Sequence, residues 1–312
     1  MVHQVAKETN GCTPGPVSGV RLVRPACPLP ATGDIVDGRY RLDRLGGRGG
    51  MATVWRALDE VTGDIVALKL HSRRHADPVR LLHEARVLGS LRHAGVVRYL
   101  AHGDPPGSPY LAMEWLEGED LSARHQRGPL TIEEALAVGL RLADALDAVH
   151  AAGVIHCDVK PSNVLLCGAT AADARLVDFG VSQPRGGGAD VPWARGAMVG
   201  TPGYMAPEQF TGEHEVDARA DLFALGSLLF ECLAGVAPFA GKHPMDTLRR
   251  TVQDPVPCVG SLRDGVPDEL SGLIATLLAR RPDDRPATAA AVAACLQRCG
   301  AGREAAVVAS PT

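Results

Sequence analysis

Lysine is scarce in this chain of 312 residues, since only four of its 32 lysine and arginine residues are lysines. Arginine supplies the other 32 − 4 = 28, and together with abundant alanine and glycine this bias indicates a GC-rich bacterial genome. The formal net charge is −4, so the composition implies no broad basic surface for nucleic acid or anionic lipid. We therefore expect neither partner.

Cysteine motifs of the C-x-x-C type and long apolar runs are also absent. None of the eight cysteines forms a C-x-x-C pair, so neither a zinc ribbon nor a small disulfide scaffold is predicted, although Cys295 and Cys299 are expected one helical turn apart. The first ten residues contain no apolar signal segment, and the run Leu222 to Phe230 is too short to span a bilayer. These absences predict a soluble, cytoplasmic protein with reduced thiols and no membrane span.

Apolar residues make up 46% of the chain, which is ample for a buried core. Residues 1–33 are rich in Pro, Gly, Ser and Thr and predict a flexible leader. The last helices are expected at 268–280 and 287–299, followed by a flexible tail at 299–312. The folded part is therefore predicted over residues 34–298.

The most informative stretch is V-I-H-C-D-V-K-P-S-N-V-L-L at residues 154–166, where a polar cluster lies between apolar ends. In this cluster Asp158 can accept a hydroxyl proton, Lys160 can neutralise a migrating phosphoryl group, and Asn163 can offer an amide oxygen to Mg²⁺. Phosphoryl transfer requires these three tasks. Taken alone, the cluster is also compatible with a polar turn that contains a salt bridge.

Three further patterns accompany this loop: V-A-L-K at Val66–Lys69, D-F-G at Asp178–Gly180 and A-P-E at Ala206–Glu208. With H-C-D-V-K-P-S-N at residues 156–163, they make the chain resemble the eukaryotic-like serine/threonine protein kinases of bacteria, over about residues 34–298.

That resemblance implies an α+β, two-lobed protein-kinase-like fold, with an antiparallel-sheet N-lobe at 34–114 and a mainly helical C-lobe at 115–298. It also implies ATP as the nucleotide, with Mg²⁺ or in its place Mn²⁺, and protein Ser or Thr hydroxyls as acceptors, with autophosphorylation as one outcome.

A glycine-rich segment, Gly46–Ala52, lies between the expected strands 40–45 and 53–58. Its backbone N–H groups can approach phosphates, although a lone hairpin of this kind is often only a flexible turn. Ala52 replaces the third glycine of the family pattern, and Gly46 takes the slot of the aliphatic residue that covers the adenine. Leu45 is the candidate for that cover through a one-residue slip, so the choice between Leu45 and Gly46 stays open.

The segment 78–91 carries an apolar stripe of helical spacing and, within it, Glu84. A solvated glutamate is common on any helix, but the resemblance pairs Glu84 with Lys69 and so directs the lysine to the α- and β-phosphates. Residues 109–118 resemble the strand and hinge that join the lobes. The nucleotide-binding positions that the resemblance implies are Leu45, Gly47, Gly49, Val54, Ala67, Lys69, Glu114, Leu116, Asp120, Asn163, Leu165 and Asp178.

By the same resemblance, Asn163 and Asp178 bind the metal ion, and Glu114 and Leu116 bind adenine through their backbones. Asp158 is the catalytic base, and Lys160 contacts the γ-phosphate. The catalytic set is Asp158, Lys160, Lys69, Glu84 and Thr201.

Four supporting contacts are implied as well. Glu208 is expected to pair with Arg285, and Asp221 to anchor the backbone of the catalytic loop. His156 is expected to pack near Phe179, and Thr201 to hydrogen-bond near Asp158 and Lys160.

Cys157 departs from the family pattern, because many kinases carry at this position an arginine that binds a phosphate on the activation loop. In Val181–Gly200 the only hydroxyl side chain is Ser182. We hypothesise that activity does not require phosphorylation in the middle of this loop. Alternatively, Cys157 is a tolerated small residue and regulation uses another surface.

Two other functions remain open at this point. A pseudokinase scaffold would share the fold without the reaction, although Lys69, Glu84, Asp158, Asn163 and Asp178 are all present. A kinase-like phosphotransferase for small molecules is disfavoured by Lys160 and by the segment G-T-P-G-Y-M-A-P-E from Gly200. The substrate, the upstream signal and the oligomeric state do not follow from the sequence.

Overall fold

The computed structural model describes residues 30–49, 52–71, 78–105, 109–168, 170–184 and 200–309. Most of the expected leader and most of the segment 181–200 lie outside these described residues.

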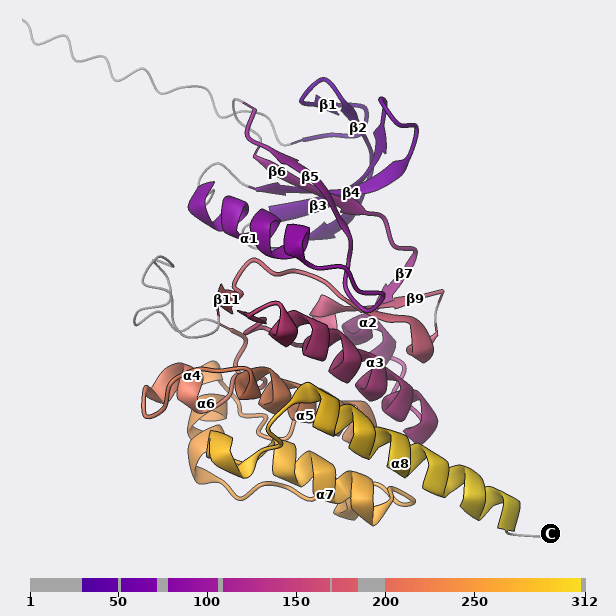
Figure 1. Ribbon diagram of the computed structural model, residues 1–312, viewed down its shortest axis with the longest axis vertical. Helices are drawn as coiled ribbons and strands as arrows, with labels where there is room; N and C mark the ends of the chain where they lie inside the picture. The colour runs from indigo at the N-terminus through magenta and orange to yellow at the C-terminus, as the bar shows by residue number, and fades with distance from the viewer. Residues whose placement is uncertain are drawn as a thin grey trace, which may run out of the picture. The chain divides into compact units, whose positions relative to one another are not determined.

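A six-stranded antiparallel sheet forms the N-terminal part of the fold, in the order β1-β2-β3-β4-β6-β5 (Figure 1). Buried and less buried residues alternate along β3, as expected for a sheet with two different faces. The strands are β1 (Ile35–Val36), β2 (Tyr40–Arg48), β3 (Ala52–Asp59), β4 (Ile65–His71), β5 (Tyr99–Gly103) and β6 (Tyr110–Glu114).

Each face of this sheet has its own apolar cluster. Tyr40, Trp55 and Leu68 belong to one cluster, and helix α1 (Pro78–Ser90) packs against β5 and β6 (Figure 1). Leu81 and Leu88 of α1 are 3% and 0% exposed, because their helical spacing turns both toward the sheet. This packing brings α1, and with it Glu84, to the sheet.

The remainder of the described chain is mainly helical. Its helices are α2 (Leu121–His125), α3 (Ile132–Ala151), α4 (Glu208–Thr211), α5 (Arg219–Ala234), α6 (Pro244–Gln253), α7 (Asp268–Leu277) and α8 (Ala289–Ala309). The short strands are β7 (Gly118–Asp120), β8 (Val154–Ile155), β9 (Val164–Cys167), β10 (Ala174–Leu176) and β11 (Gln183–Pro184). Single 3₁₀ turns are η1 (Pro161–Asn163), η2 (Ala171–Asp173), η3 (Val259–Ser261) and η4 (Pro282–Asp284).

Helices α3 and α5 lead into and support the loop after β8. The N-cap Thr131 accepts a hydrogen bond from the backbone N–H of Glu134, whose side chain bonds back to the cap, so α3 begins with a complete capping box. Gly153, at φ +75°, allows the chain to leave α3 and turn into β8. Helix α5 is apolar on nearly all sides and is correspondingly buried along most of its length.

The predicted fold class, an antiparallel sheet region followed by a mainly helical part, is confirmed. Several boundaries differ: α7 ends at Leu277, three residues before the expected end at 280, and α8 continues to Ala309, past the end expected at residue 299. Each of the two interior glycines, Gly300 and Gly302, weakens a helix by only about 1 kcal/mol relative to alanine, and the alanines around them favour helix. Among the described residues, no helix combines the length and apolar character needed to cross a bilayer.

Candidate active site

Lys69 lies at the centre of a buried charge cluster. It stands on β4 directly opposite Val54 of β3, so the sheet register determines where its side chain begins. Its ammonium lies 2.8 Å from Glu84 Oε1 on α1 and 2.8 Å from Asp178 Oδ1. The predicted pairing of Lys69 with Glu84 is therefore confirmed as a contact.

The charges of this cluster set the protonation of its members. Burial acts to lower the pKa of Lys69, but the carboxylates of Glu84 and Asp178 outweigh it, so the pKa is raised and the lysine stays an ammonium. Loss of solvent acts to raise the pKa of Asp178, yet the Lys69 ammonium lowers it to about 2. Asp178 is thus a carboxylate at neutral pH, with its side chain 48% exposed.

Asp221 of α5 anchors the loop after β8 through hydrogen bonds to the loop's backbone. Its two carboxylate oxygens accept the backbone N–H groups of His156 and Cys157, each at 2.8 Å, and His150 Nε2 lies 2.8 Å from one of them. The predicted anchoring by Asp221 is confirmed. The ring of His156 lies 4.6 Å from that of Phe179, so this predicted packing is confirmed as well.

Asp158 is the centre of a hydrogen-bonded group of four residues. Lys160 Nζ lies 2.7 Å from its Oδ2, and the Thr201 hydroxyl donates to its Oδ1 at 2.8 Å. Lys160 also donates to Thr201 Oγ1 at 2.8 Å, which confirms the predicted contact of Thr201 with both residues. Asn163 Nδ2 donates to the Asp158 backbone oxygen at 2.9 Å and to its Oδ2 at 3.1 Å.

The oxygen atoms of Asn163 and Asp178 fit the preferences of a hard cation. Both hydrogen bonds of Asn163 above use its amide nitrogen, which leaves the carboxamide oxygen as the atom for a cation. One carboxylate oxygen of Asp178, Oδ1, accepts a hydrogen bond from Lys69. The side chain is half exposed, which leaves its second oxygen for a cation. The Val177 N–H donates to the Asn163 carbonyl at 2.9 Å, so the backbones that carry the two groups run side by side.

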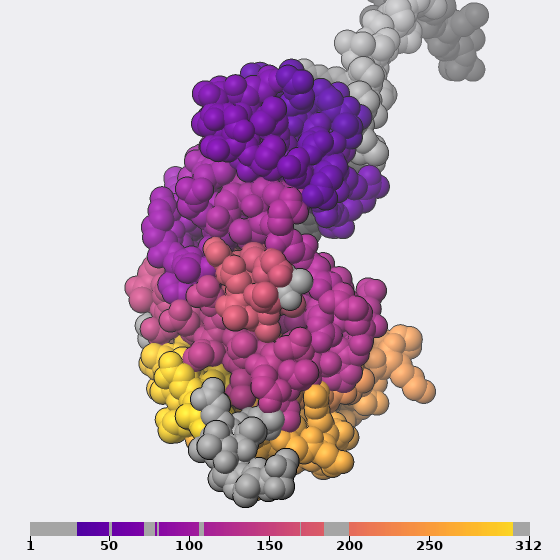
Figure 2. Space-filling view, turned by 90° about the vertical axis from the view of Figure 1, so that its right-hand side faces the viewer, coloured from indigo at the N-terminus to yellow at the C-terminus, as the bar shows by residue number. Residues whose placement is uncertain are grey.

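Most of the predicted nucleotide-binding positions fall on or next to two sheets joined by residues 115–117, whereas Asn163 and Asp178 lie in the turn η1 and after β10. On the first sheet Gly47 lies opposite Val54, and Ala67 opposite Met113, while Gly49 follows the end of β2. On the second, Asp120 of β7 lies opposite Leu165 of β9. The surface is hollowed where the indigo strands of the first sheet meet the magenta segment that follows them (Figure 2).

Two of these positions make contacts that sequence patterns did not indicate. Asp120 is the N-cap of α2 and accepts the backbone N–H of Ala123 at 2.9 Å, so one of its oxygens is engaged. Glu114, the last residue of β6, donates its backbone N–H to the Arg98 carbonyl at 2.9 Å, and its side chain accepts the Arg98 N–H at 2.8 Å. Binding of adenine or ribose by these residues stays a prediction.

Trp115 and Gly46 form a close pair at this junction. Gly46 is the extra residue of a β-bulge, because Leu45 pairs with Trp55 and Gly47 with Val54. A Cβ atom on Gly46 would lie 3.0 Å from Trp115 Cη2, so the indole fills the space of the missing side chain. Leu45 is 41% exposed. This role of Trp115 was not predicted from the sequence. The signal was Gly46 itself, because a glycine at a position that is usually aliphatic leaves space for another side chain.

Gln209 is a second residue that the sequence patterns did not single out. Its amide nitrogen donates to the Cys157 carbonyl at 3.1 Å, and its Oε1 accepts the Ala206 N–H at 2.8 Å. It therefore ties the A-P-E segment to the catalytic loop. In the same region Arg285 makes two bonds to Glu208, at 2.6 and 2.8 Å, and both side chains are 0% exposed, which confirms the predicted pair.

Cys157 is buried and adopts a left-handed backbone at φ +65°. Burial, and then the nearby carboxylates of Asp221 and Asp158, raise the pKa of its thiol well above the ordinary value. The thiol therefore stays protonated, and its surroundings are not those of a reactive cysteine.

Comparisons with known proteins agree with this geometry. Residues 40–296 match the family described as "Protein kinase domain". The serine/threonine-protein kinase PknH of Mycobacterium bovis is 40% identical over 259 residues, 81% of this chain and 42% of PknH. PknE of Mycobacterium tuberculosis is 41% identical over 258 residues, 80% of this chain and 44% of PknE. PknD of the same species is 41% identical over 257 residues, 80% of this chain and 38% of PknD. The chain therefore spans less than half the length of these relatives.

Proposed function

The chain belongs to the protein kinase family, and from this membership we propose that it transfers the γ-phosphoryl group of ATP to Ser or Thr hydroxyls of proteins. Its own hydroxyls are among the candidate acceptors. The observation that carries the proposal is the group formed by Asp158, Lys160 and Thr201, which Asn163 connects through its carbonyl to the backbone just before Asp178.

In this proposal each residue has a separate task. Asp158 accepts the proton of the attacking hydroxyl, or orients that hydroxyl, and its position is maintained by Thr201 and Asn163. The ammonium of Lys160 offsets negative charge on the transferred group. Lys69, held by Glu84, does the same at the phosphates that remain on the nucleotide.

Asn163 and Asp178 would hold a divalent cation, Mg²⁺ or Mn²⁺, and that ion would supply further neutralisation of phosphate charge. The protein contributes an Asp178 carboxylate whose pKa of about 2 keeps it ionised throughout the physiological range.

The cytoplasmic location expected from the sequence stays a prediction.

Phosphate transfer from labelled Mg-ATP to a mixed protein substrate, and to the enzyme itself, tests this function. We expect phosphoserine or phosphothreonine, and loss of the label in Asp178→Ala. Asp264→Ala, a change at an exposed aspartate far along the chain, is the matched control and should retain transfer. ATP binding without any transfer would contradict the proposal in favour of a scaffold, and label on a metabolite but on no protein would favour a small-molecule phosphotransferase.

We further propose that activity does not depend on a phosphate in the middle of the activation loop. Cys157 offers no cation for such a phosphate, and Ser182, the only hydroxyl in Val181–Gly200, is 0% exposed and donates to the Phe179 carbonyl at 2.8 Å. Treatment with a phosphatase, checked by mass spectrometry, should therefore leave the turnover of the purified protein nearly unchanged. A large loss that follows removal of a phosphate from residues 181–200 would overturn this proposal.

A further inference from the structure

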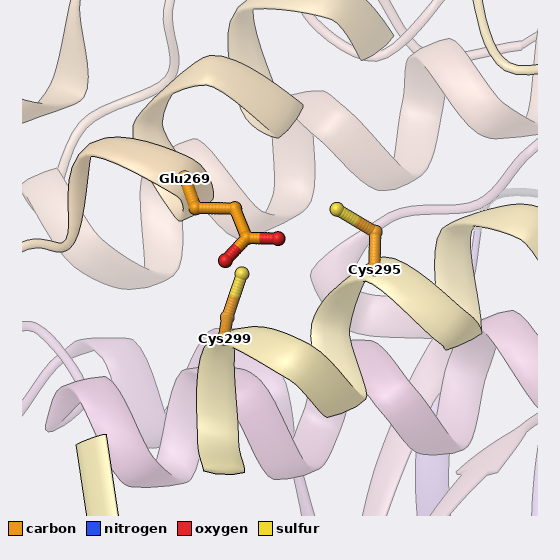
Figure 3. Close-up of side chains that lie close together, drawn as sticks. All are labelled: Glu269, Cys295 and Cys299. Atoms are coloured by element: carbon orange, nitrogen blue, oxygen red, sulfur yellow. The ribbon is translucent and has the colours of Figure 1, made fainter. Parts of the chain in front are cut away.

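A second cluster of chemically reactive side chains lies far along the chain from the motifs described above. Glu269 belongs to α7, and Cys295 and Cys299 belong to α8. One carboxylate oxygen and the two Sγ atoms all lie within 4.8 Å of one another. Figure 3 shows the carboxylate of Glu269 directed between the two thiols, which project from successive turns of the same helix.

Two packed helices create this arrangement. Residues four apart lie on the same face of a helix, so Cys295 and Cys299 both face α7, against which α8 packs. Cys299 is 3% exposed and Cys295 is partly buried, while Glu269 is exposed. The carboxylate therefore lies on the solvent-exposed side of the two thiols, and the protein interior covers their other side.

The separations suit one small ion. Zinc binds sulfur at about 2.3 Å and carboxylate oxygen at about 2.0–2.2 Å, so tetrahedral ligands lie roughly 3.5–3.8 Å apart. Starting from ligand atoms within 4.8 Å of one another, a side-chain adjustment of about 1 Å brings them to that spacing.

We propose that Glu269, Cys295 and Cys299 bind a thiophilic divalent cation of the zinc class, with a water molecule as the fourth ligand. Two sulfur ligands select zinc-like ions over Mg²⁺, which prefers oxygen. Binding releases the protons of the two thiols to solvent. The site is independent of phosphoryl transfer, and its ion joins α7 to the C-terminal helix α8.

One neighbouring group competes with the cation. Arg298 Nε lies 3.3 Å from Glu269 Oε1, and both side chains are half or more exposed. An exposed ion pair of this kind is weak, so a metal ion that also gains two thiolates can displace the guanidinium. Arg298→Ala is therefore expected to strengthen metal binding. If Glu269 instead only pairs with Arg298 and does not bind the metal, the same substitution leaves the affinity for the metal unchanged.

The test uses the full chain, stripped of metal with a chelator and kept reduced, with Co²⁺ as a spectroscopic probe and Zn²⁺ as competitor. We expect one equivalent of Co²⁺ to produce a thiolate-to-cobalt charge-transfer band that Zn²⁺ abolishes. Cys295→Ser should remove the band, and Glu269→Gln should weaken binding by roughly tenfold or more, since even outer-shell partners contribute 10- to 100-fold. Cys258→Ser, at an exposed cysteine outside the cluster, is the matched control and should retain the band.

Thermal melting gives a second, independent measurement, because a ligand that binds only the folded state raises the melting temperature. Zn²⁺ should raise the melting temperature of the parent and of Cys258→Ser, but not that of Cys295→Ser. Both test substitutions lie at positions that are not fully buried, and melting of the metal-free variants shows that they fold. Absence of the band in the parent, or its persistence in Cys295→Ser, would overturn the proposal.

Discussion

Replacing Asp158 with asparagine is expected to lower the turnover of phosphoryl transfer by about 10²- to 10⁴-fold, the usual contribution of a general base. Asparagine has nearly the same shape and can still bond to Thr201, but it accepts no proton. ATP binding should change little, because Lys69, Glu84 and Asp178 stay in contact with one another. Steady-state kinetics and a separate nucleotide-binding measurement distinguish the two effects.

The matched control is Asp264→Asn, which makes the same chemical change at an exposed position. It should have the turnover of the parent. Near-normal turnover in purified Asp158→Asn would reject the assignment of Asp158 as the base. Equal loss of turnover and of ATP binding would instead indicate damage to the whole site.

Replacing Arg285 with leucine is expected to destabilise the protein by about 3–5 kcal/mol, the usual effect of breaking a buried ion pair from one side. The change leaves the fully buried carboxylate of Glu208 without its cation. It also removes the donors to the backbone oxygens of Ala279, Arg219 and Arg280. Denaturant unfolding of parent and variant measures the difference.

Arg249→Leu is the control for this prediction. Arg249 makes ion pairs with Asp246 and Asp254, but its side chain is 48% exposed, so its loss should have a much smaller effect on the free energy of unfolding. If both variants lose the same small amount of stability, the buried pair contributes less to the free energy of unfolding than its burial implies.

Sequence patterns predicted the fold class and the contacts among motif residues because those residues occur in a few short, ordered segments. Lys69 and Glu84 meet as expected, as do Glu208 and Arg285, although the second pair is separated by 77 residues. In each pair the family resemblance indicated which residue the partner is, and the opposite charges of the two side chains favour the contact. The roles of these residues in catalysis remain predictions that the kinetic experiments address.

Other features depend on packing between segments that no motif connects. The indole of Trp115 fills the space beside Gly46 only because of a bulge in β2, and a bulge has no reliable sequence signal. The spacing of Cys295 and Cys299 predicted a shared helix face, but not that Glu269 of another helix lies opposite. The length of α8 was underestimated because Gly300 resembled a helix end.

The anchoring of the catalytic loop by Asp221 has a consequence for biosynthesis. Asp221 lies 65 residues after His156, whose backbone N–H it accepts. At typical translation rates the ribosome needs roughly 3–13 s to add that length of chain. During this interval Cys157 has no carboxylate to hold its left-handed backbone, so the loop that carries Asp158 lacks its anchor on α5. A nascent chain is thus expected to complete the proposed active site only after α5 has emerged from the ribosome and docked.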